Sequence, residues 1–185
     1  MKYLCVFLML CCIAAHSEIT NFGKAIEGVY RGGRINTKEN YAILKDLNVK
    51  TIITLEYFLD ESEKYCKVFN FECLEFPIFL DLPHSDIFFS YSTLKEAFRE
   101  VNLARLQNKV VYIHCYHGSD RTGALASALR IRQVACIGDY DKVALRKEID
   151  TTLTKYKFNA AYFPTLRSKI LDWTQNVPKW ICGDY

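Results

Sequence analysis

Two residues near the middle of the chain could act together on a phosphate group. Cys115 is followed six positions later by Arg121, in the segment VVYIHCYHGSDRTG that runs from Val110 to Gly123. A cysteine is a nucleophile only as its thiolate, and a helix N-terminus or a nearby cation stabilises that thiolate. An arginine guanidinium can bind two phosphate oxygens at once. The pair therefore predicts attack of the sulfur on phosphorus, and hydrolysis of the thiophosphate intermediate by water.

The residues around this pair predict the local structure that would position it. The apolar run Val110–Ile113 indicates a buried strand, and TGALASALRIR after Arg121 indicates a helix. Gly118 lies in the turn between them and lets the backbone approach a ligand closely. Inward-pointing loop amides and the positive end of the helix dipole form an anion site. We expect the phosphoryl group to be bound by Tyr116, His117, Gly118, Ser119, Asp120 and Arg121.

Two further residues are expected to support the loop. His114 precedes Cys115 and would tune the thiolate, and the hydroxyl of Thr122 could stabilise the sulfur as it leaves phosphorus. The alternative interpretation is a buried structural cysteine with a solvated arginine nearby. The strand, the glycine and the helix around the pair favour the catalytic interpretation.

The segment HCYHGSDRTG resembles the phosphate-binding loop of the cysteine-dependent protein tyrosine phosphatase superfamily, which has the form HCxxGxxRTG. The chain length and the upstream segments YRGGR and KTIITL are similar to the compact dual-specificity-like branch, with its bacterial and atypical members. The resemblance covers about residues 26 to 175. Many lipid-directed members carry a lysine where this chain has Ser119, so the motif does not point to phosphoinositides in particular.

The resemblance also implies a general acid on a loop, an aspartate roughly thirty residues before the nucleophile. The segment DLPHSD offers Asp81, 34 residues before Cys115, and Asp86, 29 residues before it. Asp81 directly follows a predicted strand, so we favour it as general acid and later general base. Asp86 is the alternative acid and could instead cap the next helix. His84, in the same segment, is expected to be an exposed loop residue.

The N-terminus has the pattern of a secretory signal peptide. Lys2 is followed by the uncharged apolar run Tyr3–Ala15, and Ala15-His16-Ser17 places small residues at a cleavage site. The run is short for a membrane span. We therefore expect residues 1–17 to be removed after Ser17, residues 18–185 to form one dual-specificity-like phosphatase domain, and the protein to be exported, periplasmic or secreted. A buried N-terminal strand or helix is the alternative.

Cysteine usage agrees with export. Three of the eight cysteines lie in the predicted leader, which leaves an odd number, as expected if one thiol is kept free for catalysis. Export would allow disulfides among the other four, although the sequence does not give the pairing. The alternative is that these four are small buried hydrophobic residues. The five remaining cysteines are Cys66, Cys73, Cys115, Cys136 and Cys182.

The charge and the motifs of the chain limit the classes of partner that it is expected to bind. The net charge of +3 is too small to argue for nucleic acid, and neither zinc-ligand spacing nor a nucleotide-binding glycine motif is present. We expect no metal and no cofactor. The expected partner is a phosphorylated protein, or a phosphorylated small molecule or lipid headgroup, bound by a monomer without a stable membrane span. Which phosphorylated substrate is preferred does not follow from the motif.

The remaining chain predicts an α/β fold, in which a short, mostly parallel sheet of four or five strands is flanked by helices. The catalytic loop would lie between a central strand and a helix. Residues 18–27 are expected to be irregular. Arg31 and Arg34 could reach the active site, but we favour a structural salt bridge for each. Strands are expected at 28–34, 49–55, 72–78 and 110–113, and helices at 40–47, 61–69, 91–106, 123–134, 140–149 and 163–173.

The loop motif and the family resemblance favour a protein tyrosine or dual-specificity phosphatase, which hydrolyses phosphomonoesters. Three alternatives stay open. The first is a phosphoinositide or inositol-phosphate phosphatase of the same fold, and the second is a catalytically inactive phosphate-binding module. The third is a sulfur-transfer or arsenate-reducing enzyme, which would also use a cysteine loop.

Overall fold

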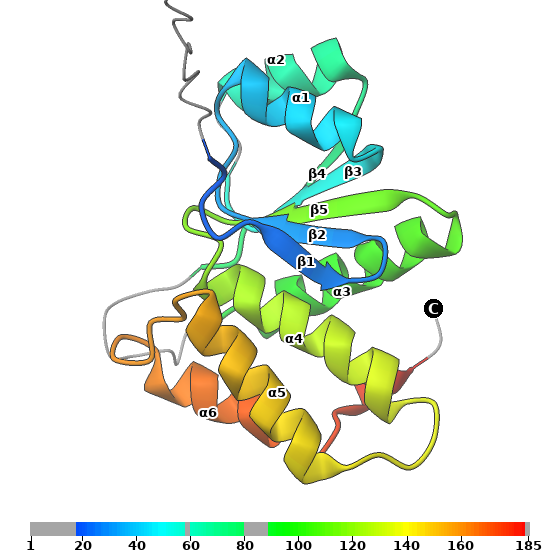
Figure 1. Cartoon of the computed structure of the whole chain (residues 1–185), viewed down its shortest axis with the longest axis vertical. Coiled ribbons are helices and arrows are strands. Elements are labelled where there is room, and N and C mark those ends of the chain that lie inside the picture. The colour runs from blue at the N-terminus through cyan, green and yellow to red at the C-terminus, as the bar shows by residue number, and fades with distance from the viewer. Residues whose placement is uncertain (1–17, 58–59, 80–88, 184–185) are drawn as a thin grey trace, which may run out of the picture.

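The computed structural model describes residues 18–57, 60–79 and 89–183 (Figure 1). The predicted signal peptide lies outside these residues. So does the segment that carries Asp81, His84 and Asp86.

A five-stranded sheet forms the middle of the fold, in the order β1-β2-β5-β3-β4. The neighbours from β2 to β4 are parallel, and only β1 is antiparallel, to β2. The prediction of a mostly parallel sheet is confirmed, with the strand that leads to Cys115 at its centre. The strands are β1 (Gly23–Ile26), β2 (Val29–Gly32), β3 (Val49–Thr54), β4 (Glu72–Glu75) and β5 (Val110–His114).

Two strand predictions are corrected. Residues 18–27 are not wholly irregular, because they contain β1, which pairs with β2 through a tight turn at Gly28, where φ is +74°. Such a turn requires a residue that tolerates positive φ. β4 ends at Glu75, three residues before the predicted end. Pro77 follows closely and lacks the N–H that a longer ladder would need.

Helices cover both faces of the sheet (Figure 1). α1 and α2 lie on one face, and α3 to α6 on the other. Thr37 caps α1, because its hydroxyl accepts a hydrogen bond from the Asn40 amide. The short α7 was not predicted. The helices are α1 (Lys38–Asp46), α2 (Asp60–Phe69), α3 (Tyr91–Leu106), α4 (Asp120–Ala135), α5 (Lys142–Lys155), α6 (Pro164–Asp172) and α7 (Lys179–Cys182).

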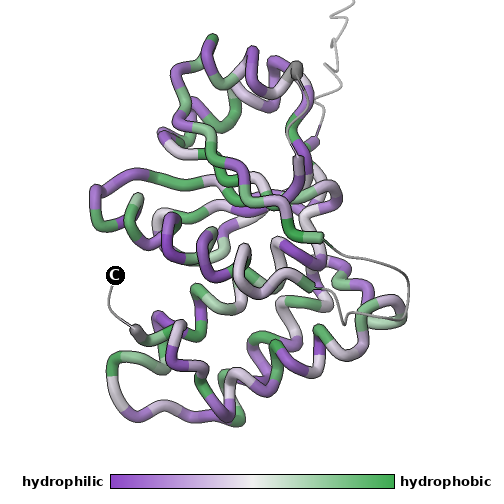
Figure 2. Tube along the Cα trace, turned by 180° about the vertical axis from the view of Figure 1, so that it is seen from behind, coloured by the Kyte–Doolittle hydropathy of each residue, from purple (hydrophilic) through white to green (hydrophobic). Residues whose placement is uncertain are grey.

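Each face of the sheet has its own hydrophobic cluster, and hydrophobic and hydrophilic residues alternate along the helices that cover it (Figure 2). On α3, Leu94, Phe98 and Val101 are completely buried. Leu106, the last residue of α3, is 74% exposed. In the parts of the chain that the structure describes, no helix is both long enough and apolar enough to cross a membrane.

Four of the five cysteines among the described residues form two disulfides, Cys66–Cys73 and Cys136–Cys182, and Cys115 is left as a free thiol. This confirms the expectation drawn from the odd cysteine count. Cys136–Cys182 joins the end of α4 to α7 and spans 46 residues, whereas Cys66–Cys73 spans 7. Loop-closure entropy gives about 4 kcal/mol of stabilisation for the longer loop and about 2 kcal/mol for the shorter one.

Candidate active site

Cys115 lies immediately after β5, at the carboxyl end of the central strand, and is 3% exposed. The register places His114 of β5 beside Gly32 of β2 and Thr54 of β3. The residues that follow those two strands therefore flank the sulfur. This is the edge at which open α/β sheets bind ligands.

Three successive carbonyl groups of the loop after Cys115 are each held by a donor from another part of the chain. The carbonyl oxygens belong to Tyr116, His117 and Gly118. Their donors are the Arg34 amide (3.1 Å), the Asn21 side-chain amide (2.9 Å) and the Arg31 guanidinium Nη2, respectively. In a trans peptide the C=O and the N–H point in opposite directions. The amides of His117, Gly118 and Ser119 are thus directed away from these donors, toward the inside of the loop, as an anion cradle requires.

Gly118 is the position at which the loop touches the rest of the sheet edge. Its φ is +70°, and a Cβ there would lie 2.3–2.5 Å from backbone atoms of Gly32 and Gly33. A side chain would therefore force the loop away from the turn after β2. Gly118 was predicted to let the loop backbone approach a ligand closely. In the structure, the close approach that requires a glycine is to the protein's own backbone at Gly32 and Gly33.

α4 begins at Asp120, directly after the loop, so its positive end faces the cradle. The Asp120 carboxylate accepts a hydrogen bond from the Asn159 amide at 2.7 Å. Burial raises the pKa of Asp120 above its usual value. The side chain of Asp120 thus anchors the segment between α5 and α6. The predicted contribution of Asp120 to phosphate binding is therefore assigned to its backbone amide.

A buried carboxylate that the sequence analysis missed, Glu56, organises the cations of the site. Arg34 Nε and Nη2 contact its two oxygens at 2.8 and 2.9 Å, which confirms the predicted salt bridge of Arg34. Arg121 Nη2 lies 4.0 Å from Glu56, and Arg121 Nη1 donates to the Leu55 carbonyl at 3.2 Å. Glu56 could have been found from the sequence, because it is an acidic residue that directly follows a predicted parallel strand.

Arg31 departs from its prediction. Within the described residues it forms no ion pair, and it is 1% exposed. Its guanidinium carbon lies 4.0 Å from the ring centroid of Tyr156, at the end of α5. The predicted salt bridge is therefore wrong for Arg31, which is surrounded by Tyr156 and by residues of α4 and α5 instead.

The two supporting residues are both buried. Burial lowers the pKa of His114 to about 4, so its imidazole is neutral at physiological pH. Its Nδ1 lies 3.9 Å from Glu56 Oε1. Thr122 is completely buried, and its hydroxyl has no hydrogen-bond partner among the described residues. Both side chains are therefore positioned under the loop rather than on its open side.

Aromatic side chains surround the open side of the loop. Tyr116 is 52% exposed and lies 4.5 Å from the Arg34 guanidinium. Its ring contacts that of His117, which is exposed. A cavity of about 240 Å³ next to Arg121 has Tyr57 and Phe79 on its walls. The other residues lining it are Glu56, Pro77 and Ile78.

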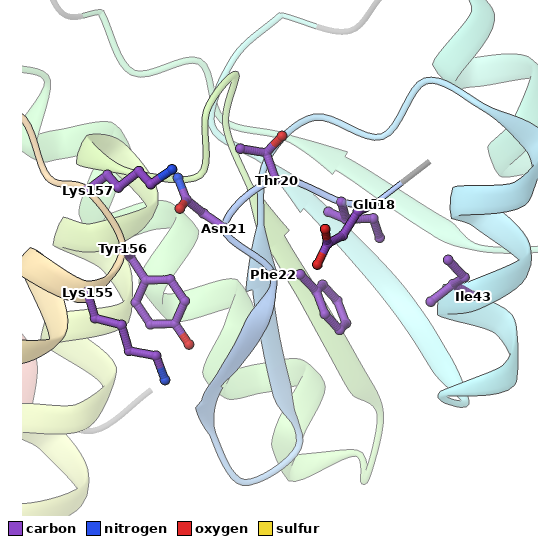
Figure 3. Close-up of a pocket in the computed structure, with 9 residues that line it drawn as sticks. Glu18, Thr20, Asn21, Phe22, Ile43, Lys155, Tyr156 and Lys157 are labelled. Atoms are coloured by element: carbon purple, nitrogen blue, oxygen red, sulfur yellow. The ribbon is translucent and has the colours of Figure 1, made fainter. Parts of the chain in front are cut away.

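A larger cavity of about 830 Å³ lies beside the loop (Figure 3). Lys155, Tyr156 and Lys157 form one wall, and the stretch from Glu18 to Phe22 with Ile43 forms the rest. Asn21 connects this cavity to the loop, because its amide donates to His117 O and to Ser119 Oγ at 3.0 Å. Asn21 and the two lysines lie far from the motif along the chain, so the sequence pattern does not reveal them.

Comparison with known proteins agrees with this geometry. Residues 27–135, more than half of the chain, match a family model described as "Polymorphic toxin system, DSP-PTPase phosphatase". The chain is 32% identical over 122 residues to inositol diphosphatase DSP3 of Arabidopsis thaliana, covering 64% of this chain and 57% of that protein. It is 26% identical over 125 residues to inositol diphosphatase DSP2 of Oryza sativa subsp. japonica, covering 63% and 56%. The chain thus spans little more than half the length of these relatives.

Solved structures show the same fold. The catalytic core of Siw14 superposes with a TM-score of 0.63 at 18% identity, covering 87% of this chain and 86% of that one. P. aeruginosa TpbA in complex with phosphotyrosine superposes with a TM-score of 0.52 at 21% identity, covering 82% and 90%. The sheet and the helices of the chain are therefore arranged as in these two structures.

Proposed function

Because the chain belongs to the DSP-PTPase phosphatase family of polymorphic toxin systems, we propose that it hydrolyses phosphomonoesters through a cysteinyl-phosphate intermediate. Cys115 attacks phosphorus, and the loop amides with Arg121 bind the phosphoryl oxygens and stabilise the charge that develops on them. The buried Thr122 hydroxyl, which has no hydrogen-bond partner among the described residues, would donate to the sulfur as it leaves phosphorus. No metal takes part in this scheme.

One observation carries the proposal. The one free thiol among the described residues lies between a central strand and a helix N-terminus, beside a loop in which three successive carbonyls are each held by a donor from elsewhere in the chain. The same arrangement would serve a phosphate-binding module, but such a module needs no thiol. Arsenate reduction would use further thiols to resolve its intermediate. The remaining cysteines of residues 18–183 are joined to one another in disulfides, which argues against it.

We propose that the substrate is a phosphoprotein, and that the enzyme acts either on phosphotyrosine alone or with dual specificity. The exposed rings of Tyr57, Phe79 and Tyr116 around the loop suit an aromatic phosphoester. The test is an assay of the protein from Glu18 onward, with chelator present, on phosphopeptides, phosphoinositides and inositol phosphates. Turnover of phosphotyrosine peptides with the highest kcat/KM is expected. A preference for any other class would replace this substrate.

A second candidate substrate is an inositol diphosphate. The support for it is that two relatives of the chain are named inositol diphosphatases. Such a substrate carries several phosphates around one ring. Lys155 and Lys157 beside the loop could bind those that are not cleaved. The same assay separates the two candidates, because Lys155→Met with Lys157→Met should raise KM for the inositol diphosphate and leave a phosphotyrosine peptide unaffected.

For the general acid we propose Asp81. An activated aryl phosphate expels a stable anion that hardly needs a proton, whereas phosphotyrosine or an alkyl phosphate needs one. Asp81→Asn should therefore make the rate depend steeply on the pKa of the leaving group, and should abolish the basic limb of the pH–rate profile. Kinetics on a series of substituted aryl phosphates measure this dependence.

Asp86→Asn is the matched control, from the same segment. It should leave the leaving-group dependence unchanged and cost at most about 1 kcal/mol of stability through loss of a helix cap. The reverse pattern would assign the proton to Asp86. If neither variant changed the dependence, the acid would have to come from elsewhere, with His84 or water as candidates.

We also propose that the protein is exported and cleaved after Ser17. The support is the charged start, the apolar run and the small residues at the cleavage site, together with two disulfides, which form in oxidising compartments. The expected N-terminus of the native protein is Glu18, and intact-mass spectrometry measures it. A chain that keeps Lys2 in the cytosolic fraction would contradict export.

A further inference from the structure

Arg31 is a buried cation with few partners. It lies on β2 opposite Ile113 of β5, two residues before Cys115 in the neighbouring strand. Its Nη2 donates to the Gly118 carbonyl, and its guanidinium carbon lies over the Tyr156 ring. Its Nε and Nη1 are buried and have no hydrogen-bond partner among the described residues.

The charge of Arg31 is retained despite burial. Burial lowers its pKa to about 10, so the guanidinium stays protonated at neutral pH. The titratable groups that act on it are the Tyr156 and Tyr112 hydroxyls, the Cys115 thiol and Asp120. No carboxylate forms an ion pair with it in the part of the chain that the structure describes. A buried charge without a paired carboxylate is unfavourable for folding, so its presence asks for a functional reason.

The geometry points to Arg31 as a positioning residue for the catalytic loop. The guanidinium fixes the Gly118 carbonyl on the outside of the loop, and the trans peptide then turns the Ser119 amide to the inside, where a phosphoryl oxygen would bind. Its positive charge lies behind the loop, next to the thiolate and the phosphoryl group that would form there. This inference rests on the proposed function of the same site.

Arg31 differs in kind from the two other groups that hold the loop. The Arg34 amide and the Asn21 side chain are neutral donors, and they act on Tyr116 and His117. Arg31 acts on the glycine that permits the close turn, and Tyr156 fixes the plane of its guanidinium from the end of α5. A lysine could keep the charge but could not lie flat on the ring while donating to Gly118.

The first measurement is binding of tungstate, a tetrahedral oxyanion, by calorimetry to protein that carries Cys115→Ser. Adding Arg31→Met should weaken tungstate binding on the order of 10- to 100-fold, by analogy with residues that orient the direct ligands of an ion. Arg31→Lys should recover only part of the affinity. In protein with Cys115 intact, the same substitutions should lower kcat more than they raise KM.

Arg146→Met is the control, because Arg146 also donates to a backbone carbonyl, that of Leu171, but between α5 and α6. It should change neither tungstate affinity nor kcat. A folded Arg31→Met protein with the tungstate affinity and kcat of the parent would overturn the inference, whatever its melting temperature, because a purely structural role moves only stability.

If Arg31→Met does not fold, Tyr156→Leu tests the same contact by removing the ring under the guanidinium, and Tyr156→Phe keeps the ring. We expect a loss of tungstate affinity with leucine and none with phenylalanine. Equal affinities in the two would count against Arg31. Should the parent protein hydrolyse no substrate while tungstate binding still depends on Arg31, the proposed function would fail and the positioning role would stand.

Discussion

Cys115→Ser is expected to abolish turnover, with a loss of at least about 10⁴-fold in kcat, the scale seen when a nucleophile is removed from other covalent enzymes. A serine hydroxyl is far less ionised than a thiol, so it cannot attack phosphorus at neutral pH. The fold should survive, since the substitution is nearly isosteric in a site that is 3% exposed. The measurement is steady-state hydrolysis of an aryl phosphate, together with the unfolding midpoint.

The matched control removes two other cysteines. Cys66→Ser with Cys73→Ser breaks the disulfide of the shorter loop, which lies on α2 and β4, away from the catalytic loop. It should lower stability and leave kcat/KM unchanged. Full activity in Cys115→Ser, or complete loss of activity on adding a chelator alone, would remove the cysteinyl-phosphate mechanism.

Much of the fold could be predicted because its patterns are local. The apolar run before Cys115 and the β-branched run Val49–Leu55 correspond to β5 and β3, and α3 has the predicted bounds. β1 was missed because GKAI shows neither a long apolar run nor clear alternation. It exists as a strand because β2 offers an edge to pair with, which is a tertiary effect.

The residues of the site also divide into those that a local pattern predicted and those that only the folded chain brings together. The loop from Cys115 to Arg121 is contiguous, so its residue types alone indicated its chemistry. Glu56, Asn21 and Arg31 come from other strands and segments, and each acts on the loop through contacts that only the folded chain creates. Spacing along the sequence cannot reveal such contacts, since parallel strands bring distant residues to one edge.

Arg121→Lys is expected to be severely impaired although the positive charge is kept. An ammonium is a point charge and cannot bind two phosphoryl oxygens in the way a planar guanidinium does. Here the guanidinium is also oriented by the Leu55 carbonyl and by Glu56, contacts that a lysine cannot make together. By comparison with loss of one oxyanion donor, transition-state stabilisation should fall by about 2 to 4 kcal/mol. That corresponds to about 30- to 900-fold in kcat/KM.

Arg130→Lys is the control from the same helix. Arg130 forms an exposed ion pair with Glu148 at 2.7 Å, a contact that contributes at most about 1 kcal/mol to stability. Its replacement should leave kcat/KM unchanged. Because the proposed mechanism has Arg121 bind the reacting phosphoryl group, Arg121→Lys should also weaken phosphate as a competitive inhibitor. Near-normal kinetics in Arg121→Lys would mean that this arginine only links α4 to the end of β3, and the loop would then have to stabilise the transition state through its amides alone.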